Sequence, residues 1–172
     1  MASKNPRPVH ICNCGNHSWA SLTRGYVTVV SPQDSYALEE KAWHACISDA
    51  ASKIVYARDS DGNFLHRVIL GLNSKLLGDH KNGNGLDNRR DNLRPSTCQQ
   101  NLRNGRAYRS SSSKFRGVRR EKRRNKWVAG IVENGVRIYL GQFELEEEAA
   151  RAYDTEAIKR YGEFSRPNFP QA

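Results

Sequence analysis

The sequence predicts an α+β protein made of small modules in series. Only 37% of its 172 residues are hydrophobic, which favours several small cores over one large core. Short β-prone runs bounded by turn residues surround a few helix-like segments. Residues 106–113 form a basic, serine-rich stretch without apolar periodicity, which is typical of a linker between two modules.

Basic residues are concentrated in the middle of the chain. The net charge is +10, yet residues 1–62 balance six Lys/Arg against six Asp/Glu. Residues 63–126 carry seventeen basic and only four acidic side chains. Such a concentration indicates a polyanion-binding protein, and a merely soluble basic surface is the alternative.

Composition also bounds the cellular context. We find no apolar run long enough to span a bilayer and no signal-peptide core at the start, so we expect no membrane partner. Four cysteines are too few for a disulfide framework, which is consistent with a reducing compartment. These features predict a cytoplasmic protein.

The first module begins after a predicted flexible arm, residues 1–8. Cys12, Cys14 and His17 follow in a Cys-x-Cys-x-x-His pattern that places three zinc-compatible donors within six residues. The sequence therefore allows a structural Zn²⁺ site, which would make the first sixty residues a zinc-stabilised interaction module. Reduced cysteines with no ligand role are the alternative.

Strand and helix signals follow this segment. Residues 26–30 and 54–58 are β-prone runs, and Asp61-Gly62-Asn63 is a turn signal. Residues 34–51 between the two strands show apolar side chains spaced loosely at three and four, which predicts a helix.

Four polar residues further along the chain stand at set separations. Asp79 and His80 are adjacent, Asn92 follows His80 by twelve residues, and Asn101 follows Asn92 by nine. This pattern resembles the HNH motif, the ββα-metal finger of many phage and intron-encoded homing endonucleases. A surface loop rich in Asn, Asp and Gly with incidental residues is the alternative.

The resemblance implies a role for each residue. His80 is implied as the general base that deprotonates water, and Asn92 as the residue that orients its imidazole through a side-chain carbonyl. Asp79 and Asn101 are implied metal ligands, although many family members carry histidine at the last position. A carboxylate and an amide are hard oxygen donors, which favours Mg²⁺ or Mn²⁺ over Zn²⁺ at this site.

Local sequence around the motif predicts a hairpin followed by a helix. His80 would end the first strand, residues 81–91 have loop chemistry, and Leu93-Arg94 would form the returning strand. Thr97 with Gln100 has the pattern of a capping box. We expect one HNH domain over residues 9–105, with its ββα-metal core at about 64–105. His66 within it is predicted to be packed or on the surface, with contact to the scissile region as the alternative.

One arginine lies just before the predicted linker and another is its first residue. Arg103 and Arg106 could track DNA phosphates between two binding modules. A solvated tether is the alternative, and the two interpretations are compatible.

The C-terminal residues 114–170 predict a sheet packed on one helix. Residues 115–120, 126–133 and 137–143 are β-prone, and Asn134-Gly135 between the last two is a type I′ hairpin signal. Residues 144–161 predict an amphipathic helix with glutamates near its start, Lys/Arg near its end and Gly162 at its C-cap. The alanines of this helix would let it lie close to the sheet.

Several segments here carry a second resemblance: residues 113–119, 126–129, 139–143, 147–154 and 168–170. Together they are similar to the DNA-binding domain of the plant APETALA and ethylene-response factors, which also occurs fused to HNH nucleases in phages. The resemblance implies a three-stranded antiparallel sheet that enters the major groove of DNA.

The same resemblance implies DNA-contacting residues. Arg116 and Arg119 match arginines of the first strand, whereas Arg137 and Tyr139 match an arginine and an aromatic residue of the third. Trp127 is predicted to be a core residue instead of a base-stacking one. Glu121, Gly130 and Val132 depart from the charged residues of the plant domains, so the plant sequence preference should not be transferred.

Taken together, these patterns predict a site-directed DNA endonuclease of the homing type, from a phage or mobile element. It would hydrolyse a phosphodiester with a histidine base and one divalent ion, and its C-terminal domain would target double-stranded DNA. One active site per chain favours nicking, and the chain could be a monomer or a homodimer. The alternative is a non-catalytic, sequence-specific regulator that retains an inert HNH finger. A bacterial host or a phage-infected cell is the compartment that the resemblance implies.

Overall fold

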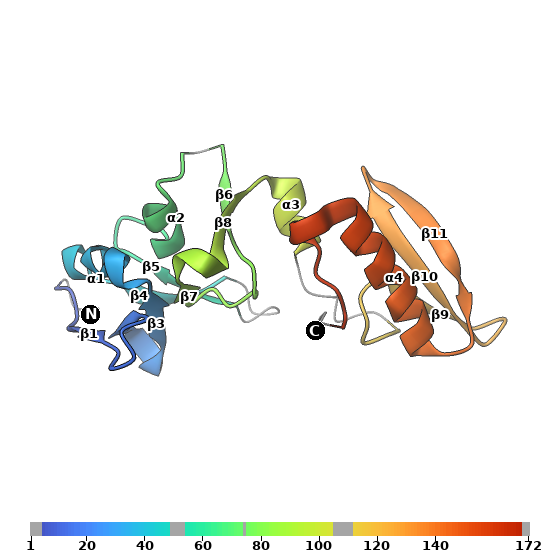
Figure 1. Ribbon diagram of the computed structural model, residues 1–172, viewed down its shortest axis with the longest axis horizontal. Coiled ribbons are helices and arrows are strands. Elements are labelled where there is room, and N and C mark those ends of the chain that lie inside the picture. Colours follow the sequence, from blue (N-terminus) through green and yellow to red (C-terminus); the bar gives the residue numbers. More distant parts are fainter. Residues whose placement is uncertain (1–4, 49–53, 74, 105–111, 170–172) are drawn as a thin grey trace. The chain divides into compact units, whose positions relative to one another are not determined.

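The computed structural model describes residues 5–48, 54–73, 75–104 and 112–169, and confirms the α+β class (Figure 1). Two compact units divide the chain, residues Met1–Cys98 and Gln99–Ala172. The described residues leave out residues 1–4 of the predicted arm, the end of the predicted helix 34–51, Arg106 and most of the serine-rich linker.

The first unit contains a four-stranded sheet with the order β1-β2-β3-β7. Its strands are β1 (Val9–Ile11), β2 (Ser18–Ser21), β3 (Val27–Val30) and β7 (Asp87–Asn88). The first three pair antiparallel, whereas β7 pairs parallel to β3, with Val30 opposite Asn88. Strand β7 lies in the loop predicted over residues 81–91, so this loop is joined to the N-terminal sheet.

The predicted helix over residues 34–51 is largely wrong. The short 3-10 helix Pro32–Asp34 leads into α1, which spans only Ser35–Glu40, and Lys41 is already extended. Residues His44–Ile47 form β4, which pairs antiparallel with β5 (Val55–Arg58). A long-range strand pairing thus overrides the local helical spacing.

A hairpin holds most of the motif. Strands β6 (Leu77–His80) and β8 (Leu93–Ser96) pair antiparallel, with Asp79 opposite Arg94. The helix α2 (Leu65–Leu70) precedes the hairpin, and Gly71 ends it in the left-handed conformation that glycine adopts without strain. Two further 3-10 turns in this unit span Thr23–Gly25 and Arg90–Asn92.

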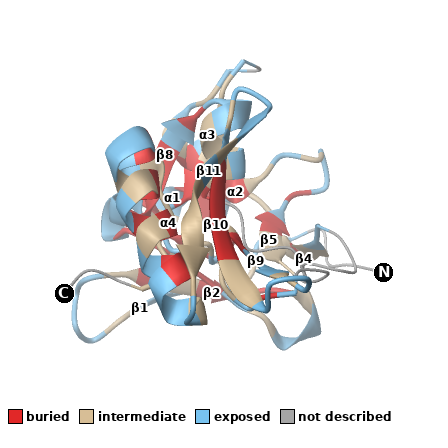
Figure 2. Ribbon diagram, turned by 90° about the vertical axis from the view of Figure 1, so that its right-hand side faces the viewer, coloured by how far each residue is buried: buried red, intermediate tan, exposed pale blue. Residues whose placement is uncertain are grey.

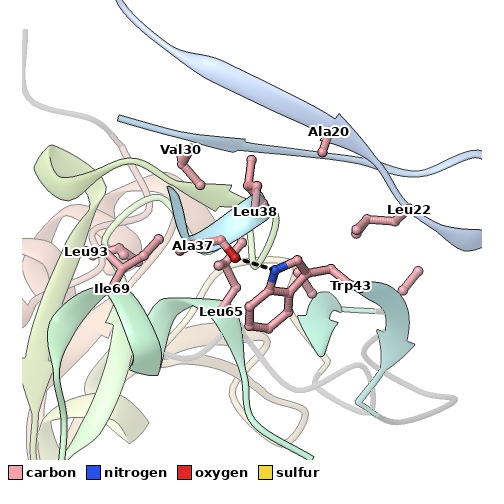
Figure 3. Close-up of a cluster of buried hydrophobic side chains, with 11 residues drawn as sticks. Ala20, Leu22, Val30, Ala37, Leu38, Trp43, Leu65, Ile69 and Leu93 are labelled. Carbon is pink, nitrogen blue, oxygen red and sulfur yellow. Dashed lines mark hydrogen bonds between the residues drawn. The ribbon is translucent and has the colours of Figure 1, made fainter. Parts of the chain in front are cut away.

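One apolar cluster joins these elements (Figure 3). Leu22 and Val30 come from the sheet region, Leu38 from α1, Leu65 from α2 and Leu93 from β8, and all are nearly or fully buried. The indole Nε1 of Trp43 donates a 2.7 Å hydrogen bond to the Ala37 carbonyl inside the cluster (Figure 3). The hairpin therefore shares its core with the N-terminal elements and is fixed relative to them.

The second unit begins within α3 (Cys98–Arg103) and contains a three-stranded antiparallel sheet of order β11-β10-β9. The strands are β9 (Val118–Glu121), β10 (Lys126–Glu133) and β11 (Val136–Phe143). Asn134 and Gly135 both have positive φ between β10 and β11, as a type I′ turn requires. The helix α4 (Glu146–Tyr161) and a 3-10 turn (Gly162–Phe164) follow.

Small side chains let α4 lie close to the sheet. Ala149, Ala150 and Ala157 are completely buried, and the central part of β10 beneath them is buried as well (Figure 2). At the end of the helix the Tyr161 hydroxyl donates a 2.6 Å hydrogen bond to the Val132 carbonyl. Trp127 packs against this core, as the sequence predicted.

The end of α3 contacts the rest of the second unit. The Arg103 guanidinium lies 4.4 Å from the centre of the Tyr161 ring, and Arg116 donates a 3.1 Å hydrogen bond to the Leu102 carbonyl. Arg166 donates to the Asn104 carbonyl at 3.3 Å. Arg103 and the backbone carbonyls of Leu102 and Asn104 are therefore engaged within this unit, although Arg103 was expected to track phosphates or to lie in a solvated tether.

Among the described helices, none is both long enough and apolar enough to cross a bilayer.

Candidate functional site

The β6–β8 pairing brings two motif side chains and one arginine into a buried position. Asp79, His80 and Arg94 are each less than 9% exposed. Arg94 donates to Asp79 Oδ2 from Nε at 2.8 Å and from Nη2 at 2.7 Å. An Asp–Arg ion pair therefore lies directly beside the histidine, and Arg94 was not singled out from the sequence.

Asn88 contacts His80 Nε2 through its side chain, whereas the role of Asn92 in orienting this imidazole stays a prediction. Asn88 Oδ1 lies 3.1 Å from His80 Nε2. The Asn92 amide instead holds the loop: its Oδ1 accepts from the Asn82 N–H at 3.0 Å, and its Nδ2 donates to the Asp87 carbonyl at 2.7 Å. Asn92 sits in a 3-10 turn that aims its amide into the loop, whereas β7 aims Asn88 at the histidine.

Further polar contacts fold the loop between β6 and β8. Asn82 Nδ2 donates to Asp87 Oδ2 at 2.9 Å, and Arg89 makes two hydrogen bonds to the same carboxylate. At Gly85 a Cβ atom would lie 2.5 Å from both the Tyr56 ring and the Val55 carbonyl, so the backbone here passes very close to β5. These contacts give the asparagine-rich loop a defined conformation, which fixes the surroundings of His80.

The environment of His80 favours the neutral imidazole. Its pKa is below the ordinary value because burial disfavours the charged ring, and this outweighs the opposing effects of Asn88, Asp79 and Asp87. The His80 ring also packs edge-on against His66, with ring centres 4.9 Å apart, and against Tyr56. A neutral imidazole can accept a proton, so His80 is suited to act as a base at neutral pH.

His66 is buried, as the sequence favoured. It lies in α2 beneath the hairpin, where a Cβ on Gly78 would come within 2.3 Å of its ring. Burial, with repulsion from His80 and Arg67, lowers the pKa of His66 to about 3. His66 is therefore a neutral packing residue.

This low pKa makes stability depend on pH. In the unfolded chain a histidine has a pKa of about 6.5. Unfolded molecules therefore take up a proton as the pH falls below about 6.5, whereas folded ones do so only near 3. The titration of His66 therefore leaves the free energy of unfolding unchanged above about pH 6.5. Below that pH it lowers this free energy, by up to about 1.4 kcal/mol per pH unit.

We expect His66→Gln to remove this part of the pH dependence. Urea unfolding of the wild type and the variant, followed between neutral pH and about pH 4, gives the difference between the two proteins. The difference isolates His66 from other titrating groups. Parallel stability curves for the two proteins would contradict the prediction.

Asn101 lies in α3, within the second unit, whereas Asp79 lies in the first. Their joint role as metal ligands therefore stays a prediction. Asp79 itself suits a hard divalent ion, because its carboxylate is held by the hairpin next to His80.

Cys12, Cys14 and His17 are brought together in the turn between β1 and β2. One ligand atom from each lies within 4.8 Å of the others, and Cys14 Sγ is 3.6 Å from His17 Nδ1. The hydrogen bond between the Cys14 and Cys12 thiols is the main cause that lowers the pKa of the Cys14 thiol. Backbone hydrogen bonds between residue 12 and residues 15 and 17 close the turn. The cluster could hold a metal ion.

The sheet of the second unit has one face away from α4. Ile138 and Leu140 pack toward the helix, so Arg137 and Tyr139, which alternate with them, point to the opposite face. Arg119 alternates with the buried Val118 in the same way. Tyr139 is 63% exposed and the Arg119 side chain 48% exposed. This open face carries three of the predicted DNA-contacting residues.

The other predicted DNA contacts are less accessible or outside the described residues. Arg116 is partly buried and is bonded to Leu102, and Arg103 stacks on Tyr161. Arg106 lies outside the described ranges. The open face is therefore the better candidate for contact with DNA.

Comparison with known proteins identifies this second region. The family model of the AP2 domain matches residues 113–163. This part of the chain is an AP2 domain. Plant proteins match it too: "Dehydration-responsive element-binding protein 2A" of Arabidopsis thaliana is 46% identical over 65 residues, and "Ethylene-responsive transcription factor ERN1" of Lotus japonicus is 45% identical over 67. These matches cover 37% and 38% of this chain, and 19% and 24% of the plant proteins.

A longer match extends beyond the AP2 domain. An uncharacterized HNH endonuclease of Acanthamoeba polyphaga mimivirus is 37% identical over 110 residues, or 60% of this chain. The match spans 56% of the viral protein, so this chain spans about half the length of that relative. The chain thus combines an AP2 domain with similarity to a protein named as an HNH endonuclease.

Proposed function

We propose that this protein is a metal-dependent DNA endonuclease that its AP2 domain directs to double-stranded DNA. The observation that carries the proposal is the buried, neutral His80 beside the Asp79 carboxylate on a rigid hairpin. A base of this kind is what hydrolysis of a phosphodiester requires. The similarity to the viral protein named as an HNH endonuclease supports the same reaction.

In this mechanism the motif residues have separate roles. His80 accepts the proton of the attacking water, and the folded loop prevents its ring from turning away. Asp79 and Asn101 would hold one Mg²⁺ or Mn²⁺ through oxygen atoms. When bound, that ion would stabilise the negative charge on the leaving oxygen. One site per chain favours nicking of one strand.

The AP2 domain would supply most of the affinity for DNA. Arg119 and Arg137 on its open face can contact phosphates or bases, and Tyr139 offers an exposed aromatic ring. We also propose a homing-type role in a bacterial host or a phage-infected cell, as the resemblance of the HNH spacing to homing endonucleases implies.

The test is cleavage of supercoiled plasmid and genomic DNA by purified protein, with Mg²⁺ or with chelator, followed by mapping of the new ends. Metal-dependent ends at recurrent sites support the proposal, and the ratio of nicked to linear plasmid decides whether one strand is cut. Tight, salt-sensitive binding without cleavage of any DNA, including DNA from the source of the protein, would favour the alternative of a non-catalytic regulator.

The Asp79–Arg94 pair gives a second test that needs no cleavage. Arg94→Met removes the guanidinium that forms a buried ion pair with the Asp79 carboxylate, which is expected to cost about 3–5 kcal/mol of stability. If Asp79 binds Mg²⁺, the ion should restore part of this loss, because it replaces the missing positive charge. Thermal unfolding with and without Mg²⁺ measures the effect.

The matched control is Arg89→Met, which breaks the ion pair of Asp87, a carboxylate that we do not assign to the metal. Its unfolding temperature should not respond to Mg²⁺ more than that of the wild type. An equal response in both variants would argue against Asp79 as a ligand.

We further propose that Cys12, Cys14 and His17 bind Zn²⁺. The 3.6 Å distance from Cys14 Sγ to His17 Nδ1 is close to the separation of about 3.6 Å that follows from tetrahedral coordination with usual Zn–S and Zn–N bond lengths. The two sulfurs lie 2.9 Å apart and would have to separate by somewhat less than about 1 Å. The lowered pKa of Cys14 favours the thiolate that coordinates zinc.

Metal analysis of protein purified without added zinc tests this site. We expect one Zn²⁺ per chain in the wild type, and loss of that ion in Cys14→Ser. Cys98→Ser is the control, since Cys98 is an exposed free cysteine outside the cluster. Equal zinc contents in all three proteins would argue against the assignment, as would a Cys12–Cys14 disulfide found by mass spectrometry of freshly purified protein.

A further inference from the structure

A chain of buried hydrogen bonds leads from the N-terminal sheet to His80. The Thr28 hydroxyl lies 3.0 Å from the Leu86 carbonyl, and Asn88 Nδ2 lies 2.9 Å from Thr28 Oγ1. Asn88 Oδ1 in turn lies 3.1 Å from His80 Nε2. Thr28 and Asn88 are at most 1% exposed, so water does not compete for these contacts.

The chemistry of these groups fixes the direction of every bond. The Leu86 carbonyl can only accept, so the single hydroxyl proton of Thr28 points to it. Thr28 Oγ1 must then accept from Asn88, which places the NH₂ group of the amide toward Thr28 and its oxygen toward the histidine. An amide oxygen cannot donate, so His80 Nε2 has to carry a proton.

The geometry points to Thr28 and Asn88 as positioning residues that fix the His80 imidazole with a proton on Nε2, so that Nδ1 is the nitrogen that acts as the base. This inference rests on the proposed function for its catalytic meaning. Thr28 lies 52 residues before His80 and Asn88 lies 8 residues after it, and neither belongs to the HNH spacing. The inference therefore gives a supporting role in catalysis to residues outside that motif.

The backbone of the sheet holds this arrangement in place. Strand β7 pairs parallel to β3, and the Val29 N–H donates to the same Leu86 carbonyl at 3.0 Å. Thr28 and Asn88 thus sit on neighbouring strands, and their contact depends on the register of those strands. A rotation of the Asn88 amide would break both of its side-chain contacts at once, which is costly in a buried position.

Two substitutions at Thr28 separate the hydroxyl from the volume of the side chain. Thr28→Val keeps the shape but removes the hydroxyl, so the Asn88 amide is free to turn and His80 can adopt either tautomer. Thr28→Ser keeps the hydroxyl and serves as the conservative control. Urea unfolding of both variants checks that the fold is retained.

The primary readout is the ¹⁵N spectrum of the imidazole nitrogens, recorded near neutral pH without DNA or added metal and assigned with His80→Gln. We expect the wild type and Thr28→Ser to show the Nε2–H tautomer of His80, and Thr28→Val to show a mixture. Single-turnover cleavage at saturating DNA should fall about tenfold in Thr28→Val, which corresponds to the loss of roughly one buried hydrogen bond. Thr28→Ser should keep most of the rate, and DNA affinity should be unchanged in both.

An Nδ1–H tautomer in the wild type would overturn the inference, even if no variant folds. So would a Thr28→Val protein that keeps both the tautomer and the cleavage rate of Thr28→Ser. The proposed function fails separately, if His80→Ala cleaves DNA as fast as the wild type or if no protein cleaves at all. In that case the spectrum still decides the tautomer.

Discussion

Replacing His80 with alanine is expected to lower the rate of DNA cleavage by about 10²- to 10⁴-fold, the range typical of a lost general base. His80 is buried beside Asp79, and its lowered pKa keeps the imidazole neutral and able to accept a proton at neutral pH. The neighbouring His66 of α2 cannot replace it as the base, because its pKa is about 3 and its ring is packed beneath Gly78. Single-turnover cleavage at saturating DNA and Mg²⁺ measures the effect.

DNA binding provides the internal comparison for this variant. The candidate DNA-contacting face belongs to the AP2 domain, so His80→Ala should bind DNA with nearly unchanged affinity and salt dependence. His44→Ala removes a partly buried histidine of β4 from the same unit and should cleave at close to the wild-type rate. A wild-type rate for pure His80→Ala protein would exclude His80 as the base.

The hairpin could be predicted from the sequence because its strand and turn signals are local. Asp79 and His80 end one strand, the Asn/Gly-rich run forms the loop, and Leu93 starts the returning strand, as predicted from turn chemistry. The partner of His80 could not be predicted in this way. Asn88 reaches the histidine because β7 adds to the N-terminal sheet, and its contact with Thr28 joins residues sixty positions apart.

The same limit explains the error over residues 34–51. Six residues do form a helix there, but the next apolar residues alternate inside a strand, with Ala45 opposite Ala57. A window of local sequence contains no information about a partner strand ten residues later. Ion pairs that involve a buried residue cannot be predicted for the same reason. Arg90 forms a bidentate ion pair with the fully buried Asp34, and the sequence near either residue does not indicate the other.

In the AP2 domain the local signals were strong enough to predict most of the structure. Asn134-Gly135 forms the predicted turn, and the helix begins at Glu146 and ends at Tyr161, close to the predicted 144–161. The uses of individual arginines were less predictable. Arg103 and Arg116 carry the same charge as Arg119. Within the unit, however, Arg103 stacks on the Tyr161 ring and Arg116 donates to the Leu102 carbonyl.

A large effect on stability is also expected at Gly117, just before β9. Its φ is +76°, which strains any residue with a Cβ, and that Cβ would lie 1.9 Å from the buried Tyr153 ring. The strain in Gly117→Ala should cost about 1–3 kcal/mol, and the steric overlap about 1–3 kcal/mol more. A unit of this size is stable by only about 4–10 kcal/mol, so much of its stability would be lost.

Gly135→Ala is the matched control, because Gly135 has a similar φ of +80° but a Cβ there would meet no atom within 4 Å. It should lose only the part caused by backbone strain. Hydrogen exchange of the full chain can follow each unit separately: in Gly117→Ala the amides of β9, β10 and β11 should lose protection while those of β2 and β3 keep it.

DNA binding should weaken along with this loss of protection. The reason is that Gly117 places no side chain on DNA, so the variant can act only through the fold of the AP2 domain. If β9–β11 stayed protected and DNA binding still fell, the effect would have to lie in a direct contact made by this turn. If both stayed at wild-type level, Tyr153 would have to move to make room for the methyl group, and the close contact between β9 and α4 would not be what holds the sheet to the helix.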